Sequence, residues 1–532
     1  MNAASKSAAA RNRRKAAGEP PAADPAIGAT PTAETFARTY AKGLPQLVWT
    51  RLVADLETPV SASLKLAKGR PMSFLLESVE GGAVRGRYSV IGLEPDVVWR
   101  AFGDRAEINR SPLSAPDTFK AERQPALTSL RALLAESRIE LPDGLPPMAA
   151  GIFGYMGYDT VRLIEQLPNV RPDVLHVPDS ILVRPTLMVI FDAVKDEMTI
   201  VTPVYPRQKV SPEKAYAAAL QRLESVTTAL DAPLPHEAVP ATGDLAAPEP
   251  VSNTTPAEYL AMVDRAKEYI AAGDAFQIVL SQRFSAPFAL SSMALYRALR
   301  RTNPSPFLFH LDFGDFALVG SSPEILVRCR DGEVTIRPLA GTRRRGATPA
   351  EDKALEKDLL ADPKERAEHL MLLDLGRNDV GRVSKIGTVR VASSFDVERY
   401  SQVMHLSSTV HGELDPKHDA IDALMAGFPA GTLSGAPKVR AMEIIDELEK
   451  EKRGPYAGCV GYFSADGNMD SCIVLRTAIV KDGRMYVQAG AGLVADSVPE
   501  AEQNECILKA RALFKAAEEA VRFAGSQRRG NR

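Results

Sequence analysis

Apolar residues recur with a helical period near the middle of the chain. From Tyr259 to Ile270 they follow one another at steps of three and four residues, which places them on one face of a helix. The segment opens with Thr-Pro-Ala-Glu at residues 255–258, a capping-box pattern with proline in the first helical position. Gly273 provides a stop signal. The pattern predicts a helix that begins at residue 256 and opens a new domain.

Other apolar runs are spread along the whole chain. Short runs predict strands at residues 72–76, 88–91, 181–191, 276–280, 317–320, 334–336 and 485–489. Longer patterns predict helices at residues 350–360, 364–375, 437–450 and 500–523. The stretch from Cys472 to Ala489 has two apolar runs around Lys481-Asp482-Gly483, which is typical of a hairpin. We therefore predict an α+β fold built on antiparallel sheet.

Proline-rich composition divides the chain. Between Pro233 and Pro250 five prolines stand among Ala, Gly and Glu without any apolar period, which indicates a linker. The predicted organisation is a disordered N-terminal extension at residues 1–32, a first domain at 33–230, a linker at 231–254, a second domain at 255–524 and a basic tail at 525–532. An organelle transit peptide is the alternative for the Arg-rich start, but Glu19 and Asp24 count against it.

Charge and cysteine content exclude several classes of protein. The 532 residues include 65 Lys and Arg against 67 Asp and Glu, so the net charge is −2 and no basic excess favours nucleic acid. The four cysteines have no Cys-x-x-Cys spacing, which argues against structural zinc and a disulfide framework. No run approaches the ~18 apolar residues of a membrane span. These features predict a cytoplasmic protein that binds neither nucleic acid nor membrane.

Two predicted helices carry clustered carboxylates. Glu502, Glu505 and Lys509 share one face of the last helix, and Glu365 and Glu368 lie on an earlier one. Paired carboxylates can bind Mg²⁺ together with waters and an anionic substrate. The alternative is a solvated helix face, and the residues alone do not exclude it.

Loops and histidines offer further candidates without deciding the chemistry. Gly341-Thr342 and Gly490-Ala491-Gly492 follow strands and permit close backbone approach to an anion, or simply a turn. The loop at residues 428–438 precedes a helix but lacks a P-loop ending. His405 lies in an apolar, strand-like context, where a core role is the alternative. Nucleophile motifs of hydrolases are absent from the sequence.

Seven stretches in the same order resemble the chorismate-binding enzyme family, and most closely its anthranilate synthase branch. The resemblance spans residues 256–523 and implies a two-domain fold in which antiparallel sheets form a β-sandwich with helices outside. Two stretches of the first domain, at residues 74–78 and 154–159, match the same branch. The seven stretches are 274–281, 321–324, 338–343, 368–379, 435–438, 488–492 and 502–509.

The resemblance implies that chorismate and ammonia react to give anthranilate and pyruvate through an aminodeoxyisochorismate intermediate. It assigns Mg²⁺ to Glu368 and Glu505, with Glu502 close by. It implies Glu324 as general acid for the departing C4 hydroxyl and His405 and Lys509 as proton-handling residues. Thr342 is also implied in catalysis. The implied substrate-binding residues are Gly341, Thr342, Thr432, Tyr456, Arg476, Gly490, Ala491 and Gly492.

Two positions distinguish this chain from other branches of the family. Aminodeoxychorismate synthases usually carry a nucleophilic Lys where this chain has Ala340, and a methyl group cannot attack. Water-adding members carry a Lys base where this chain has Gln277, and an amide cannot deprotonate water. The alternatives that stay open are aminodeoxychorismate synthase component I and a catalytically silent, tryptophan-binding regulatory subunit.

The resemblance also implies partners and an inhibitor. No cysteine fits a glutaminase elbow, so ammonia is expected from a separate glutamine amidotransferase component II. Tryptophan is expected to inhibit by binding in the first domain and at its junction with the second. The implied inhibitor-binding residues are Ser78, Pro306, Phe307, Leu308, Tyr462 and Cys472.

Overall fold

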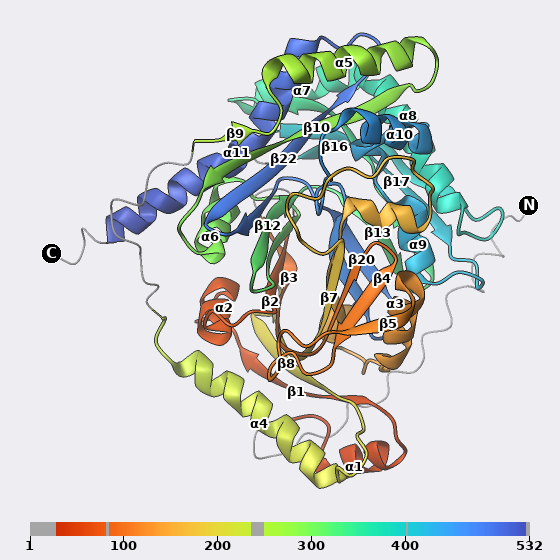
Figure 1. Ribbon diagram of the computed structural model, residues 1–532. Helices are drawn as coiled ribbons and strands as arrows, with labels where there is room; N and C mark the ends of the chain where they lie inside the picture. Colours follow the sequence, from red (N-terminus) through yellow and green to blue (C-terminus); the bar gives the residue numbers. More distant parts are fainter. Residues whose placement is uncertain (1–27, 81–83, 236–248, 401–402, 528–532) are drawn as a thin grey trace, which may run out of the picture.

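The computed structural model describes residues 28–80, 84–235, 249–400 and 403–527 (Figure 1). Residues 1–27 of the predicted extension at 1–32, most of the linker and residues 528–532 of the basic tail lie outside these residues. Thr30 belongs to the fold, because it exchanges two backbone hydrogen bonds with Trp49 at 2.8 Å. The described part of the predicted extension is therefore paired with the first strand.

The strands form one hydrogen-bonded network, and all the pairings among the described residues are antiparallel. This confirms the predicted α+β class with antiparallel sheet. The strands are β1 (Gln46–Val53), β2 (Ser73–Glu80), β3 (Val84–Phe102), β4 (Arg105–Asn109), β5 (Lys120–Pro125), β6 (Gly151–Met156), β7 (Ser180–Asp192), β8 (Glu197–Val204), β9 (Val251–Ser252), β10 (Gln277–Pro287), β11 (Phe307–Asp312), β12 (Phe316–Ser322), β13 (Ile325–Arg330), β14 (Glu333–Ile336), β15 (Leu339–Arg344), β16 (Arg390–Arg399), β17 (Val403–Glu413), β18 (Gly435–Ala436), β19 (Cys459–Ser464), β20 (Met469–Ile473), β21 (Thr477–Lys481) and β22 (Arg484–Leu493).

Helices cover the outside of this network (Figure 1). In Figure 1 α5, α10 and α11 lie over the upper strands, and α1 and α4 close the lower end. The helices are α1 (Ala33–Ala41), α2 (Pro59–Ala67), α3 (Ala126–Glu136), α4 (Pro212–Asp231), α5 (Pro256–Ala271), α6 (Ser292–Thr302), α7 (Pro349–Ala361), α8 (Pro363–Gly381), α9 (Ala420–Gly427), α10 (Lys438–Leu448) and α11 (Pro499–Gln527). None of the described helices is long and apolar enough to cross a membrane.

Local sequence signals account for several helix ends. Thr255 and Glu258 form the predicted capping box at the start of α5, with both reciprocal hydrogen bonds present. The helix predicted at residues 364–375 continues to Gly381. Gly376 lies buried inside this helix, where α8 packs against Ile336 and Pro338.

Strands from the two halves of the chain pair directly. β2 pairs with β11, which places Ser78 opposite Phe307, and β6 pairs with β19, which places Phe153 opposite Tyr462. Strands β2 and β6 of the first half of the chain therefore lie directly beside β11 and β19 of the second half. The division into two domains at residues 231–254 stays a prediction.

Candidate active site

Glu324 occupies the short connection between β12 and β13, and its side chain is only 7% exposed. The Leu339 backbone N–H donates to its Oε1 at 3.3 Å, and the Thr432 hydroxyl lies 3.3 Å from both carboxyl oxygens. Burial raises the pKa of Glu324 to about 8, although both hydrogen bonds act in the opposite direction. Glu324 therefore carries a proton at neutral pH, as a general acid must.

His405 faces a bulge in the neighbouring strand. The β15–β17 register shifts between Ala340 and Thr342, and Gly341 adopts φ +67°, which favours glycine. The Gly341 carbonyl and the Thr342 hydroxyl each lie 3.0 Å from His405 Nδ1. Because a carbonyl only accepts, Nδ1 carries the hydrogen and Nε2 keeps its lone pair. Burial lowers the pKa of His405 to about 4, so the imidazole is a neutral base at neutral pH.

Three predicted metal ligands lie within electrostatic reach of one another. Burial, and then the charges of Glu365 and Glu505, raise the pKa of Glu368. Burial also raises the pKa of Glu502, and the charge of Glu505 again adds to this. A bound divalent cation would stabilise the charged forms of Glu368 and Glu502, whose pKa values are raised. The donor set therefore fits Mg²⁺ chemically.

The side chains do not surround a single point. No group of three His, Cys, Asp or Glu among the described residues is placed to hold a metal ion. Glu505 instead forms an ion pair with Lys509 at 2.6 Å. Among the described residues, Glu368 makes no hydrogen bond to Glu502 or Glu505. The charges of these carboxylates thus influence one another, although their oxygens do not converge on one ion position.

Glu365 was not among the predicted metal ligands, yet it belongs to the same surface. Its charge acts on Glu368, and its Oε1 accepts from Arg343 Nη1 at 2.9 Å. Its Oε2 would lie 3.1 Å from a Cβ at Gly341. The signal for Glu365 was its three-residue spacing from Glu368, which repeats the spacing between Glu502 and Glu505.

Arg476 carries a guanidinium that lies within electrostatic reach of Glu505. It follows β20, has φ +51°, and makes no side-chain hydrogen bond or ion pair within the described residues. Burial lowers the pKa of Arg476, and the charge of Glu505 partly opposes this. A planar guanidinium without a partner suits a bidentate carboxylate ligand.

The glycines of β22 lie where side chains would not fit. A Cβ at Gly490 would be 2.7 Å from the Leu280 carbonyl and 3.0 Å from the Tyr456 hydroxyl. A Cβ at Gly492 would be 2.5 Å from Gln277 Nε2. Lys509 Nζ donates to the Gly490 carbonyl at 2.9 Å. The structure thus brings Tyr456 and Lys509 close to Gly490.

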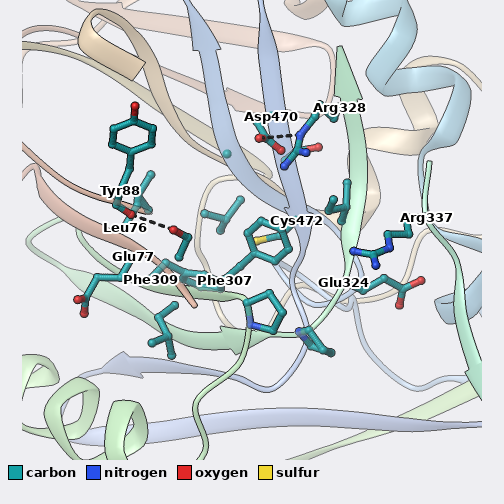
Figure 2. A pocket seen from close by; sticks show the side chains of 18 of the residues that line it. Leu76, Glu77, Tyr88, Phe307, Phe309, Glu324, Arg328, Arg337, Asp470 and Cys472 are labelled. Carbon is teal, nitrogen blue, oxygen red and sulfur yellow. Dashed lines mark hydrogen bonds and ion pairs between the residues drawn. The ribbon is translucent and has the colours of Figure 1, made fainter. Parts of the chain in front are cut away.

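A cavity of about 650 Å³ opens next to Glu324 (Figure 2). Figure 2 shows Glu324 and Arg337 at one end and Leu76 and Tyr88 at the other, with Phe307 between them. The Ser78 hydroxyl donates to the Tyr88 carbonyl at 3.0 Å. All the predicted inhibitor-binding residues line this one cavity: Ser78, Pro306, Phe307, Leu308, Tyr462 and Cys472.

Charged pairs line the remaining walls of the cavity. Asp470 accepts from Arg328 Nε at 3.0 Å and from Arg330 Nη2 at 2.9 Å. Near Glu324, Arg337 pairs with Glu398 at 2.5 Å. The cavity therefore combines apolar walls with both signs of charge, and it reaches from the first half of the chain to the proposed acid.

Comparison with known proteins identifies relatives over nearly the whole chain. Residues 78–515 match the family model described as chorismate binding enzyme. The anthranilate synthase component 1 of Cereibacter sphaeroides is 56% identical over 502 residues, which cover 94% of this chain and 99% of the relative. That of Pseudomonas putida is 48% identical over 499 residues, covering 91% and 97%. The crystal structure of anthranilate synthase component I from Streptococcus pneumoniae TIGR4 matches with a TM-score of 0.71 at 36% identity, covering 87% of this chain and 99% of that one.

Proposed function

The chain belongs to the chorismate-binding enzyme family and is a lyase of the anthranilate synthase type, and we propose that it converts chorismate and ammonia to anthranilate and pyruvate. The observation that carries the proposal is that the fold contains both a buried, protonated Glu324 and a neutral His405. The first can donate a proton and the second can accept one, at the same pH.

Glu324 acts in the first step. Its proton goes to the C4 hydroxyl of chorismate, which leaves as water while ammonia forms the new C–N bond on the ring. Thr432 and the Leu339 N–H hold the carboxyl in place and stabilise the carboxylate that remains. Ala340 and Gln277 leave no lysine to attack or to activate water, so ammonia adds directly.

His405 acts in the second step, in which the enolpyruvyl group leaves as pyruvate and the ring becomes aromatic. Its Nε2 is the free basic atom, because Nδ1 donates to Gly341. Lys509 is already engaged with Glu505 and with the Gly490 carbonyl. We therefore assign removal of the ring proton to His405 and charge stabilisation to Lys509.

Substrate carboxylates are divided between two regions. Gly341 and Thr342 would face the ring carboxylate, and Arg476, Tyr456 and the segment from Gly490 to Gly492 would hold the enolpyruvyl carboxylate. Glu368 and Glu505 would hold Mg²⁺, with Glu502 and Glu365 beside them, and the bound ion would neutralise the ring carboxylate.

Two further assignments complete the proposal. Ammonia comes from a separate glutamine amidotransferase component, for which a high ammonium concentration substitutes. Tryptophan occupies the cavity between Ser78 and Cys472, whose apolar walls suit an indole ring. Because this cavity also borders Glu324, an occupant can alter the environment of the acid.

A fluorescence assay tests the proposed function. Chorismate, Mg²⁺ and ammonium are added to the chain alone, and anthranilate emission is followed with and without tryptophan. Anthranilate formation that tryptophan suppresses supports the whole proposal. No turnover combined with measurable tryptophan binding would favour a silent regulatory subunit instead.

A further inference from the structure

Arg453 lies beneath the candidate site and is only 2% exposed. Its Nε donates to Glu449 Oε2 at 2.9 Å and its Nη2 to Glu449 Oε1 at 2.6 Å. Glu449 is itself 4% exposed. A buried ion pair is tolerated only when both charges are fully hydrogen-bonded, and bidentate geometry fixes their relative position. The pair is therefore a rigid element.

One side of this pair holds the loop that contacts the acid. Arg453 Nη1 donates to the Leu433 carbonyl at 2.8 Å. Leu433 follows Thr432, whose hydroxyl contacts both carboxyl oxygens of Glu324 at 3.3 Å. A shift of Arg453 would therefore move the backbone next to the hydroxyl that orients the acid.

The other side holds β10, the strand that backs the glycine segment. Arg453 Nη2 donates to the Val279 carbonyl at 2.7 Å, and Glu449 Oε1 accepts from both the N–H and the hydroxyl of Ser281 at 2.8 Å. In the β10–β22 register Val279 lies opposite Gly492 and Ser281 opposite Gly490. The same pair thus fixes the strand behind the proposed carboxylate-binding residues.

An aromatic contact adds a third connection. The Arg453 guanidinium carbon lies 4.7 Å from the centre of the Tyr158 ring and 5.6 Å from that of Tyr456. Tyr456 is a proposed substrate contact, and its hydroxyl lies beside Gly490. Such contacts are attractive and directional in a buried setting.

We propose that Arg453, held by Glu449, is a positioning residue that aligns the Glu324 side of the site with the side formed by β22 and Tyr456. Arg453 acts only through Leu433, Val279 and Tyr456 and does not touch the reacting atoms. The proposal rests on the proposed function, because it concerns the two ends of the same substrate. Lysine cannot replace the arginine here, since it lacks a planar fork that donates in three directions at once.

Arg453→Lys and Glu449→Gln are the direct tests. We expect kcat/KM for chorismate, with ammonium as the nitrogen source, to fall ~100-fold in Arg453→Lys, the size of effect that small misplacements produce. Glu449→Gln keeps the acceptor for Ser281 and should lose less. Both kcat and the KM for chorismate should change, because Thr432 and the glycine segment move together. The alkaline limit of the pH profile should also shift, since the Thr432 contact with Glu324 is disturbed.

A matched pair elsewhere in the chain separates positioning from stability. Arg184 is 5% exposed, bonds Asp96 through Nε and Nη2 at 2.8 and 2.9 Å, and stacks on Tyr205 at 4.3 Å. It does not line the cavity. Arg184→Lys should lower the melting temperature about as much as Arg453→Lys while leaving kcat/KM and the pH profile at wild-type values.

Ser281→Ala provides a variant that removes only one hydroxyl and so tests the link even if the arginine variant does not fold. We expect a ~5-fold rise in the KM for chorismate, the loss of about one hydrogen bond. Wild-type kcat, KM and pH profile in folded Glu449→Gln and Ser281→Ala would overturn the proposal, as would equal losses in Arg184→Lys. If the wild-type chain makes no anthranilate, the proposed function fails by itself. Calorimetric titration with chorismate then decides the positioning role, which requires weaker binding in Glu449→Gln than in Arg184→Lys.

Discussion

The Thr432 hydroxyl lies 3.3 Å from both carboxyl oxygens of Glu324, across 108 residues of sequence. A single hydroxyl shared by two oxygens can follow the carboxyl as it changes from acid to carboxylate. The loop that carries Thr432 therefore orients the Glu324 carboxyl, in addition to its predicted role in binding the substrate.

Glu324→Gln should lower kcat by ~100-fold or more, the usual contribution of a general acid. Glutamine keeps the size of the side chain and can still accept from Thr432, but it has no acidic proton. Burial raises the pKa of Glu324 to about 8, so the active, protonated form predominates below that pH and is lost above it. The wild-type kcat should therefore fall as pH rises through about 8, and pH-rate profiles of both proteins measure this. The assignment is wrong if the alkaline limb persists unchanged in Glu324→Gln.

His405→Gln should remove most of the turnover, on the order of 100-fold, because glutamine cannot take the ring proton. Burial lowers the pKa of His405 to about 4, so the neutral base persists from neutral pH down toward that value. Wild-type kcat should consequently show no acid limb near ~6.5, the ordinary value for histidine. Such a limb, present in the wild type and absent in His405→Gln, would mean that the imidazole titrates normally.

Glu505→Gln should abolish Mg²⁺-dependent turnover while the fold stays intact. Removing one carboxylate weakens the ion's site and also leaves Lys509 without its partner at 2.6 Å. Activity is titrated against Mg²⁺ after treatment with EDTA, and circular dichroism checks the fold. Glu500→Gln is the matched control, because Glu500 lies exposed in the first turn of the same helix. Equal Mg²⁺ curves for the two variants would remove Glu505 from the metal site.

Ser78→Ala should raise the tryptophan concentration for half-inhibition ~5-fold, which corresponds to about one hydrogen bond. The Ser78 hydroxyl lines the cavity and donates to the Tyr88 carbonyl at 3.0 Å, and among the described residues it accepts no hydrogen bond, so a ligand can donate to it. Inhibition is expressed relative to each variant's own rate without tryptophan. Ser73→Ala, on the same strand but outside the cavity, is the control. An unchanged inhibition curve for Ser78→Ala would place tryptophan elsewhere.

Local pattern was sufficient for much of the fold. The capping box at Thr255 and Glu258 predicted the start of α5, and the periodic carboxylates placed Glu502 and Glu505 on one helix. These features depend on neighbours within a few residues, which a sequence displays directly. The predicted helix ended at residue 375, whereas α8 continues to Gly381 and packs there against Ile336 and Pro338, which are distant in sequence.

Contacts between distant segments could not be predicted in this way. The pairing of Ser78 with Phe307 and the bond from Arg453 to Leu433 join segments whose spacing carries no signal. The raised pKa of Glu324 likewise comes from burial by the whole fold. Motif resemblance supplied the candidate residues, and the structure brings Glu324 to Thr432 and His405 to Thr342, but it does not gather the carboxylates around a single ion position.

Product identification tests the central claim most directly. The wild-type chain is incubated with chorismate, Mg²⁺ and nitrogen-labelled ammonium, and the products are analysed by mass spectrometry. We predict labelled anthranilate and pyruvate in equal amounts. Labelled 4-amino-4-deoxychorismate without pyruvate, or an unlabelled water adduct of the ring, would contradict it.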